Sequence, residues 1–102
     1  MEESVREFFE GLPSRVDASR TAGMNNSYVF DIAGAGTWTV KVADGSVTVD
    51  EGDLGGDCTI STSEENFAKI IAGEQNATTA YMSGKIKVKG NMGAAMKLQK
   101  LF

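Results

Sequence analysis

The 102-residue chain contains no histidine and only one cysteine. Histidine is the commonest general base near neutral pH and the commonest metal ligand in proteins, so its absence removes the usual centre of both kinds of site. The lone Cys58 has no second cysteine for an internal disulfide, which is typical of proteins in the reducing cytoplasm. No acid–base constellation is visible elsewhere. The sequence therefore predicts a cytoplasmic protein that is not an enzyme and uses no cofactor or metal.

Long hydrophobic runs are also missing. A membrane-spanning helix needs about 18 consecutive apolar residues, and no segment approaches that length. The first residues, MEESVREFFEGLPSR, are acidic and amphipathic, whereas a signal peptide has a basic segment followed by an apolar one. With 41% hydrophobic and 24% charged residues the composition is that of a globular protein, and the length predicts a single domain over residues 1–102.

Charge is distributed unevenly along the chain. Residues 1–74 contain all fourteen acidic residues and five of the ten basic ones, a net charge of −9. Residues 75–102 contain five lysines and no acid, a net charge of +5. Because the whole chain is acidic, we expect no nucleic-acid partner. Its basic end could still contact an anionic surface, such as a membrane.

Hydrophobic spacing predicts the elements of the first half. Val5, Phe8, Phe9 and Leu12 recur at helical spacing, and Gly11 and Pro13 are expected to stop this helix. Residues 13–23 suggest a short second helical turn. The period then changes to two over residues 27–50, which predicts a three-stranded meander with one dry face and one wet face. Its turns are GAG and DG, the second being typical of a tight hairpin.

The second half alternates strands and helices. A fourth strand is expected over residues 53–61, followed by a helix over 61–73 and a shorter helix between 76 and 84. KIKVKG (85–90) predicts a last strand and residues 91–102 a last helix. The predicted fold class is α+β: a five-stranded, mostly antiparallel sheet with helices packed on one face.

Three other motifs do not predict a site. Asp50, Glu51, Asp53 and Asp57 gather in one loop, but they lack the spacing of a calcium-binding EF-hand and are interpreted as a solvated loop. GAG precedes a strand, so it is not a dinucleotide fingerprint. Residues 61–63 are interpreted as helix caps, because the chain offers no histidine to activate a serine.

The last predicted helix is apolar around most of its circumference. The apolar positions are Met92, Ala94, Ala95, Met96, Leu98, Leu101 and Phe102. Gly93, Lys97 and Lys100 form a narrow stripe with Gln99 on its border. Such a helix must be covered by something.

Lys85, Lys87 and Lys89 on the preceding strand are interpreted as a wet sheet face or a protected edge, with membrane docking as the alternative.

Residues 57–102, DCTISTSEENFAKIIAGEQNATTAYMSGKIKVKGNMGAAMKLQKLF, resemble the second half of the sterol carrier protein type 2 family of small lipid-transfer domains. Residues 80–98 are the most specific part, and TWTVKV (37–42) with its hairpin to GSVTV also fits. The resemblance implies an apolar cavity, roofed by the last helix, that takes an acyl chain, a sterol or a similar lipid. The ending QKLF departs from the Ser-Lys-Leu peroxisomal signal of eukaryotic relatives, which puts peroxisomal residence in doubt.

The resemblance also implies which side chains contact the lipid. Methionine suits an irregular cavity because its thioether is flexible, although each apolar residue could equally be plain core. The lipid-contact residues are expected to be Phe9, Leu12, Phe30, Trp38, Val40, Ile60, Phe67, Ile71, Tyr81, Met82, Met92, Met96 and Gln99.

The implied function is non-enzymatic carriage of a fatty acid, fatty acyl group, sterol or similar apolar ligand. The alternative is an accessory module that presents a lipid to a partner enzyme. Two further partners stay open: an anionic membrane, contacted transiently, and a second copy of the chain in a homodimer.

Overall fold

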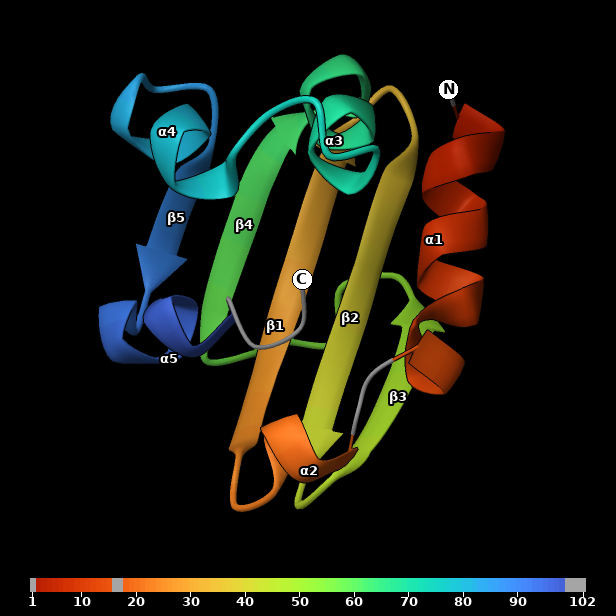
Figure 1. Cartoon of the computed structure of the whole chain (residues 1–102), viewed down its shortest axis with the longest axis vertical. Coiled ribbons are helices and arrows are strands. Elements are labelled where there is room, and N and C mark those ends of the chain that lie inside the picture. The colour runs from red at the N-terminus through yellow and green to blue at the C-terminus, as the bar shows by residue number, and fades with distance from the viewer. Residues whose placement is uncertain (1, 16–17, 99–102) are drawn as a thin grey trace.

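The computed structural model describes residues 2–15 and 18–98. Its centre is a five-stranded sheet of order β3-β2-β1-β4-β5 (Figure 1). The strands are β1 (Asn25–Ala33), β2 (Gly36–Ala43), β3 (Ser46–Glu51), β4 (Cys58–Ser63) and β5 (Lys87–Gly90). Only the β1–β4 pair is parallel, and the other three pairs are antiparallel. The expected mostly antiparallel sheet is confirmed.

Five helices accompany the sheet in the described part of the chain: α1 (Glu2–Arg15), α2 (Ala18–Thr21), α3 (Glu64–Ile71), α4 (Ala77–Met82) and α5 (Met92–Lys97). Helix α1 packs against β3 and α3, while α3 contacts β4 and β1. Helix α5 packs against β4 and β5, and Figure 1 shows α4 and α5 at the two ends of β5. The α+β class with helices over the sheet is confirmed.

The core between α1, α3 and the sheet is a cluster of aromatic rings. Phe9 stacks on Trp38 with ring centroids 4.6 Å apart and on Phe67 at 5.4 Å. Phe8 meets the edges of Phe9 and Phe67 at 5.4 and 5.6 Å. Phe30 completes the cluster from β1, 5.2 Å from Phe9. Such ring pairs add stability beyond the apolar area they bury.

Helix α1 does not stop where the sequence predicted. It continues through Gly11 and Pro13 to Arg15. Proline in a helix removes one backbone hydrogen bond and costs about 3 kcal/mol in a helix interior. Full burial of Phe9 and Leu12 offsets that cost, because each buried side chain contributes about 1.5–3 kcal/mol. Tertiary packing thus outweighs the local stop signal.

Turns and caps follow the sequence closely. Asp44 and Gly45 have φ of 44° and 88°, the left-handed conformations of the tight hairpin turn between β2 and β3. The side chains of Ser63, Asn76 and Asn91 accept hydrogen bonds from the first turns of α3, α4 and α5. Of the three residues expected as caps, only Ser63 is one. The prediction was wrong for Ser61 and Thr62, which lie in β4 because the strand extends to the cap.

The face of the sheet opposite α1 and α3, called the second face here, is not exposed to water throughout. The prediction of one wet face was wrong for the middle of this face. The β3–β4 connection crosses this face, since β4 must lie parallel to β1. Thr39 Oγ1 donates to Gly52 O at 2.7 Å and accepts from Leu54 N at 3.0 Å. The amide of Asp57 donates to Ser27 O at 2.8 Å. Val29, the cross-strand partner of Thr39, is buried although its neighbours in β1 on that face are polar.

Candidate functional site

Most predicted lipid-contact residues lie between the sheet and the helices. Seven of the thirteen are buried in the core cluster: Phe9, Leu12, Phe30, Trp38, Val40, Ile60 and Phe67. Ile71 is partly buried against the same cluster. Because these side chains come from α1, α3 and three strands, they define an apolar inner layer. We use this name for those eight residues.

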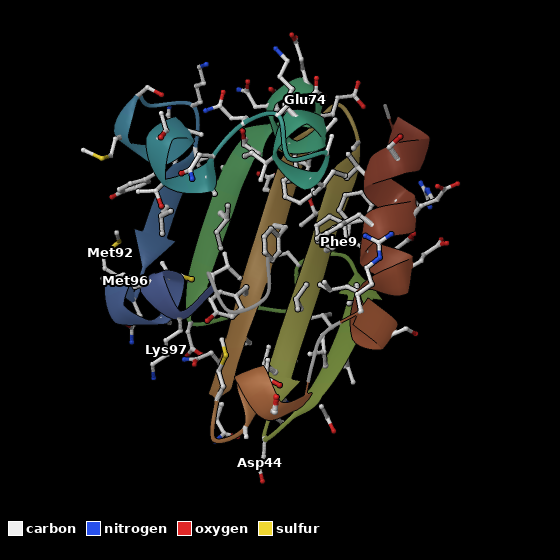
Figure 2. All side chains as sticks on the ribbon, in the orientation of Figure 1. Phe9, Asp44, Glu74, Met92, Met96 and Lys97 are labelled. Carbon is white, nitrogen blue, oxygen red and sulfur yellow. The ribbon has the colours of Figure 1, made fainter. Side chains whose placement is uncertain are left out.

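The remaining predicted residues do not join the inner layer. Tyr81 and Met92 are each 44% exposed, while Met96 is 70% and Met82 is 81% exposed. Figure 2 shows Met92 and Met96 at α5, on the opposite side of the molecule from Phe9. Gln99 lies outside the described residues. Contact with a lipid stays a prediction for all thirteen.

Helix α5 joins the sheet through its small residues. Ala94 is buried, and Ala95 and Leu98 are partly buried against the core. The helix is described over Met92–Lys97, half the span predicted from the sequence, and Leu101 and Phe102 lie outside the described residues. The apolar circumference therefore divides into a packed alanine side and an exposed methionine side.

Tyr28 ties α5 to the middle of the sheet. Its buried hydroxyl donates to Ala94 O at 2.6 Å. Burial raises the pKa of Tyr28 above its usual value, and the nearby Cys58 and Asp57 raise it further, so the phenol stays a neutral donor. Tyr28 is not among the residues that the sequence predicted to contact a lipid. The signal was available, because a buried tyrosine hydroxyl usually needs a partner.

Cys58 is not equipped for nucleophilic chemistry. The side chain is buried in β4. Burial, and then the charge of Asp57, raises the pKa of its thiol to about 11. Since the thiolate is the reactive form, Cys58 behaves as a small apolar core residue near neutral pH.

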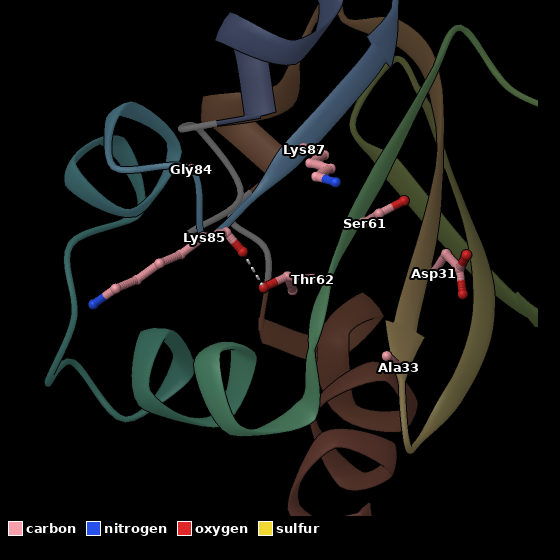
Figure 3. A pocket seen from close by; sticks show the side chains of 7 residues that line it. All are labelled: Asp31, Ala33, Ser61, Thr62, Gly84, Lys85 and Lys87. Atoms are coloured by element: carbon pink, nitrogen blue, oxygen red, sulfur yellow. Dashed lines mark hydrogen bonds between the residues drawn. The ribbon is translucent and has the colours of Figure 1, made fainter.

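Two surface pockets lie away from α5. The larger, about 440 Å³, runs between α1 and α3, with Phe8 and Ile71 in its wall and Arg15 and Lys69 among its polar residues. The other, about 240 Å³, lies on the second face of the sheet (Figure 3). Neither pocket lies under α5, so the cavity that the resemblance implies stays a prediction.

The smaller pocket combines polar groups from three neighbouring strands. Asp31 lies opposite Ser61 in the β1–β4 register, and Ser61 lies opposite Lys87 in the β4–β5 register. Thr62 Oγ1 donates to Lys85 O at 2.8 Å, which joins β4 to the chain entering β5 (Figure 3). Such a polar cross-strand row is ordinary for a sheet face that meets water.

Acidic side chains of the 50–57 segment make structural contacts. Glu51 pairs with Arg6 of α1 at 2.8 Å. Asp57 Oδ2 accepts from the amide of Ser27 at 2.9 Å, and Asp53 Oδ1 accepts from that of Gly55 at 2.9 Å.

In the described part of the chain, no helix has the length and apolar character needed to cross a bilayer.

The mixed sheet, its apolar inner layer and the short last helix define a small α+β fold. The model of the SCP-2 sterol transfer family matches residues 6–102. The chain therefore belongs to this family, and the resemblance noted in the sequence is confirmed.

Known relatives include both carriers and larger proteins. The chain is 42% identical over 66 residues to human sterol carrier protein 2, covering 64% of this chain and 12% of the human protein. The solved structure of palmitated SCP2L2 from Aedes aegypti has a TM-score of 0.76 at 19% identity, with 99% of this chain and 92% of that chain covered. The sec-alkylsulfatase Pisa1 from Pseudomonas sp. has a TM-score of 0.78 at 21% identity, covering 92% of this chain and 15% of that chain.

Proposed function

We infer that this domain binds one apolar lipid in its inner layer and carries it without changing it chemically. The observation that supports this function most strongly is the match of a sterol-transfer family model to residues 6–102. The inner layer adds a physical basis, because aromatic and aliphatic side chains from helices and sheet face one another there. Palmitate in the Aedes aegypti relative favours a fatty acid or fatty acyl ligand.

The energy of burial fits such a role. A sixteen-carbon chain contributes roughly 12 kcal/mol when each methylene contributes about 0.8 kcal/mol. Ordering and association remove several kcal/mol, which leaves an affinity on the order of micromolar to nanomolar. The inner-layer rings contact one another between the helices and the sheet. Binding therefore requires α1, α3 or α5 to move away from the sheet.

No catalytic step is part of the proposal. The chain has no histidine, and the thiol of Cys58 is buried with a raised pKa. Binding and release are then the whole activity, and we place them in the cytoplasm, which suits a free thiol. Delivery is proposed to involve a brief contact with an anionic membrane.

A second candidate function is presentation of a lipid to an enzyme. The matching region forms 15% of the Pseudomonas alkylsulfatase, so this fold occurs as one part of a larger enzyme. In that role the ligand would pass to a partner enzyme, or across a homodimer, instead of to a membrane.

Native mass spectrometry of the purified protein tests the proposed function. We expect a one-to-one adduct with the mass of a fatty acid or related lipid, and displacement of a fluorescent fatty acid by palmitate at micromolar concentration. A folded protein that carries no lipid and binds neither fatty acids nor sterols would contradict carriage. Stable co-elution with an enzyme, with lipid released only in its presence, would favour presentation.

A further inference from the structure

The outer side of α5 is apolar and exposed. Met92 and Met96 are 44% and 70% exposed, and they are four positions apart, which places both on one side of the helix. Figure 2 labels both side chains at α5, near the sheet edge formed by β5. An exposed apolar group of this kind marks a contact surface when it is continuous with others.

Helix α4 presents another exposed methionine at the other end of β5. Met82 in α4 is 81% exposed. Strand β5 pairs only with β4 among the described strands, so α4, β5 and α5 together form one edge of the molecule (Figure 1). We call Met82, Met92 and Met96 the methionine edge. Thioether side chains adapt to irregular surfaces, including mixed lipid head groups and acyl chains.

The same edge carries concentrated positive charge. Lys85, Lys87 and Lys89 lie at or just before β5, Lys97 ends α5, and all four are exposed, with Lys87 reaching the second face of the sheet. Residues 75–102 contain no acid, and no ion pair between described residues involves these four lysines. Asp57 comes next to the edge, because its carbonyl accepts from Asn91 N, but its carboxylate accepts from the amide of Ser27. Asp31 lines the same small pocket as Lys85 and Lys87, but no ion pair between described residues holds any of the four lysines, so their charge is available to an external partner.

We propose that the methionine edge and its four lysines form the surface that docks on an anionic lipid bilayer. The methionines enter the interfacial layer, and the lysines contact the phosphate and carboxylate groups of the lipids. A second copy that paired through the same edge would bring like charge against it. The acidic remainder, net −9, is repelled from the bilayer and orients the approach. This assignment rests on the proposed lipid carriage, because docking brings α5 and the adjoining inner layer to a lipid source.

Methionine methyl NMR with spin-labelled vesicles tests the docking surface. The protein with methyl-labelled methionines is mixed with vesicles of phosphatidylcholine containing about one-third phosphatidylserine and a nitroxide lipid. We expect the methyl signals of Met82, Met92 and Met96 to broaden, while that of the buried Met24 does not. Pure phosphatidylcholine vesicles should produce little broadening. Broadening confined to residues outside this edge would overturn the assignment.

Variants then separate the apolar and the electrostatic contributions. The double variant Met92→Ser/Met96→Ser should lose at least about tenfold in partition to anionic vesicles, because two apolar side chains no longer enter the interface. Leu54→Ser is the matched control, since Leu54 is 68% exposed and lies in the acidic 50–57 segment. Its partition should stay unchanged. Equal losses in the two proteins would contradict docking through the methionine edge.

The double variant Lys87→Gln/Lys89→Gln tests the charges. It should lower partition to anionic vesicles by about 30-fold at low salt, because each lysine near the surface contributes about 1 kcal/mol. Lys41→Gln, on strand β2, is the control and should change it little.

Binding of a fluorescent fatty acid in solution distinguishes this inference from the proposed function. If every variant binds the fatty acid but even the original protein ignores anionic vesicles, the docking surface is wrong while carriage stands. If sedimentation without vesicles shows a dimer that Met92→Ser/Met96→Ser abolishes, the edge is a homodimer interface and the inference fails. Loss of fatty acid binding in the original protein would instead contradict carriage.

Discussion

At the scale of single residues, Tyr28 has the most specific role in the structure. Its hydroxyl lies in the apolar layer and supplies a partner to the Ala94 carbonyl, across 66 positions of sequence. The amide of Leu98 donates to Ala95 instead, so the short helix itself does not use this carbonyl in the ordinary helical pattern. One hydrogen bond thus links the centre of the sheet to α5, the helix that the sequence predicted as a roof.

We predict that Tyr28→Phe lowers the free energy of unfolding by about 1–3 kcal/mol, because the Ala94 carbonyl loses its buried partner. It should also speed the release of a bound fatty acid, since α5 is held less firmly. Urea unfolding and stopped-flow release measure the two effects. Tyr81→Phe is the matched control, because Tyr81 is 44% exposed and should change stability by less than about 0.5 kcal/mol. Equal effects would show that the buried hydroxyl contributes nothing special.

Cys58 and Tyr28 predict sensitivity to alkaline pH. Each has a raised pKa in the folded state, so the unfolded chain loses its proton first and unfolding becomes more favourable as pH rises. The free energy of unfolding should keep its full value below about pH 9 and decrease between pH 9 and pH 11. Deprotonation of Cys58 accounts for up to about 2 kcal/mol of that decrease. Urea midpoints across that range measure the fall, which Cys58→Ala should reduce. An unchanged fall in that variant would exclude the thiol as a cause.

At the scale of elements, β5 and α5 depend on a close backbone approach. Gly90 has φ of 103°, and a Cβ atom there would lie 2.5 Å from Asp57 O. The next amide, Asn91 N, donates to the same carbonyl at 2.9 Å, and the Asn91 side chain caps α5. The end of the last strand and the start of the last helix are therefore set against the start of β4.

We predict that Gly90→Ala destabilises the protein by more than about 3 kcal/mol, from backbone strain together with the clash. Gly84→Ala is the control: its φ is 81°, but nothing lies within 4 Å of the added atom, so only about 1 kcal/mol is expected. Chemical unfolding of both proteins tests the difference. Similar losses would mean that the contact with Asp57 relaxes without cost.

Sequence patterns located most elements but not all their ends. The caps at Ser63, Asn76 and Asn91 follow local chemistry, since each side chain bonds an amide three positions ahead. The end of α1 does not, because burial of Phe9 and Leu12 extends the helix past Gly11 and Pro13. For the candidate site, alternation identified the inner layer correctly as apolar, whereas the outward direction of Met92 and Met96 depends on which side of α5 meets β4.

At the scale of the whole molecule, the inner layer and the methionine edge are distinct surfaces of one small domain. The inner layer lies between the sheet and α1 and α3, and the methionine edge lies at β5. A carrier needs both a place to hold a lipid and a place to meet the lipid's source. Helix α5 takes part in both, since its alanine side contacts the core and its methionine side meets solvent.

We predict that a bound fatty acid changes the emission of Trp38, the one tryptophan of the chain. Trp38 is buried and stacks on Phe9, so a ligand that separates α1 from the sheet must alter its surroundings. Titration with palmitate, followed by fluorescence, measures the change. Its stoichiometry should match that from native mass spectrometry. Saturated binding without any change in emission would place the ligand outside the Phe9–Trp38 contact.

The sequence by itself determined the α+β class, the strand and helix order, the caps and the apolar character of the sheet face. These properties depend on periodicity and on contacts between residues close in the chain, so they can be recognised without the fold. Only the tertiary structure decided that β4 lies parallel to β1, that Val29 is buried on the second face, that α1 passes Pro13, and that the α5 methionines are exposed. The physical reason is that burial depends on neighbours distant in sequence, and an apolar side chain alone does not specify which neighbour will cover it.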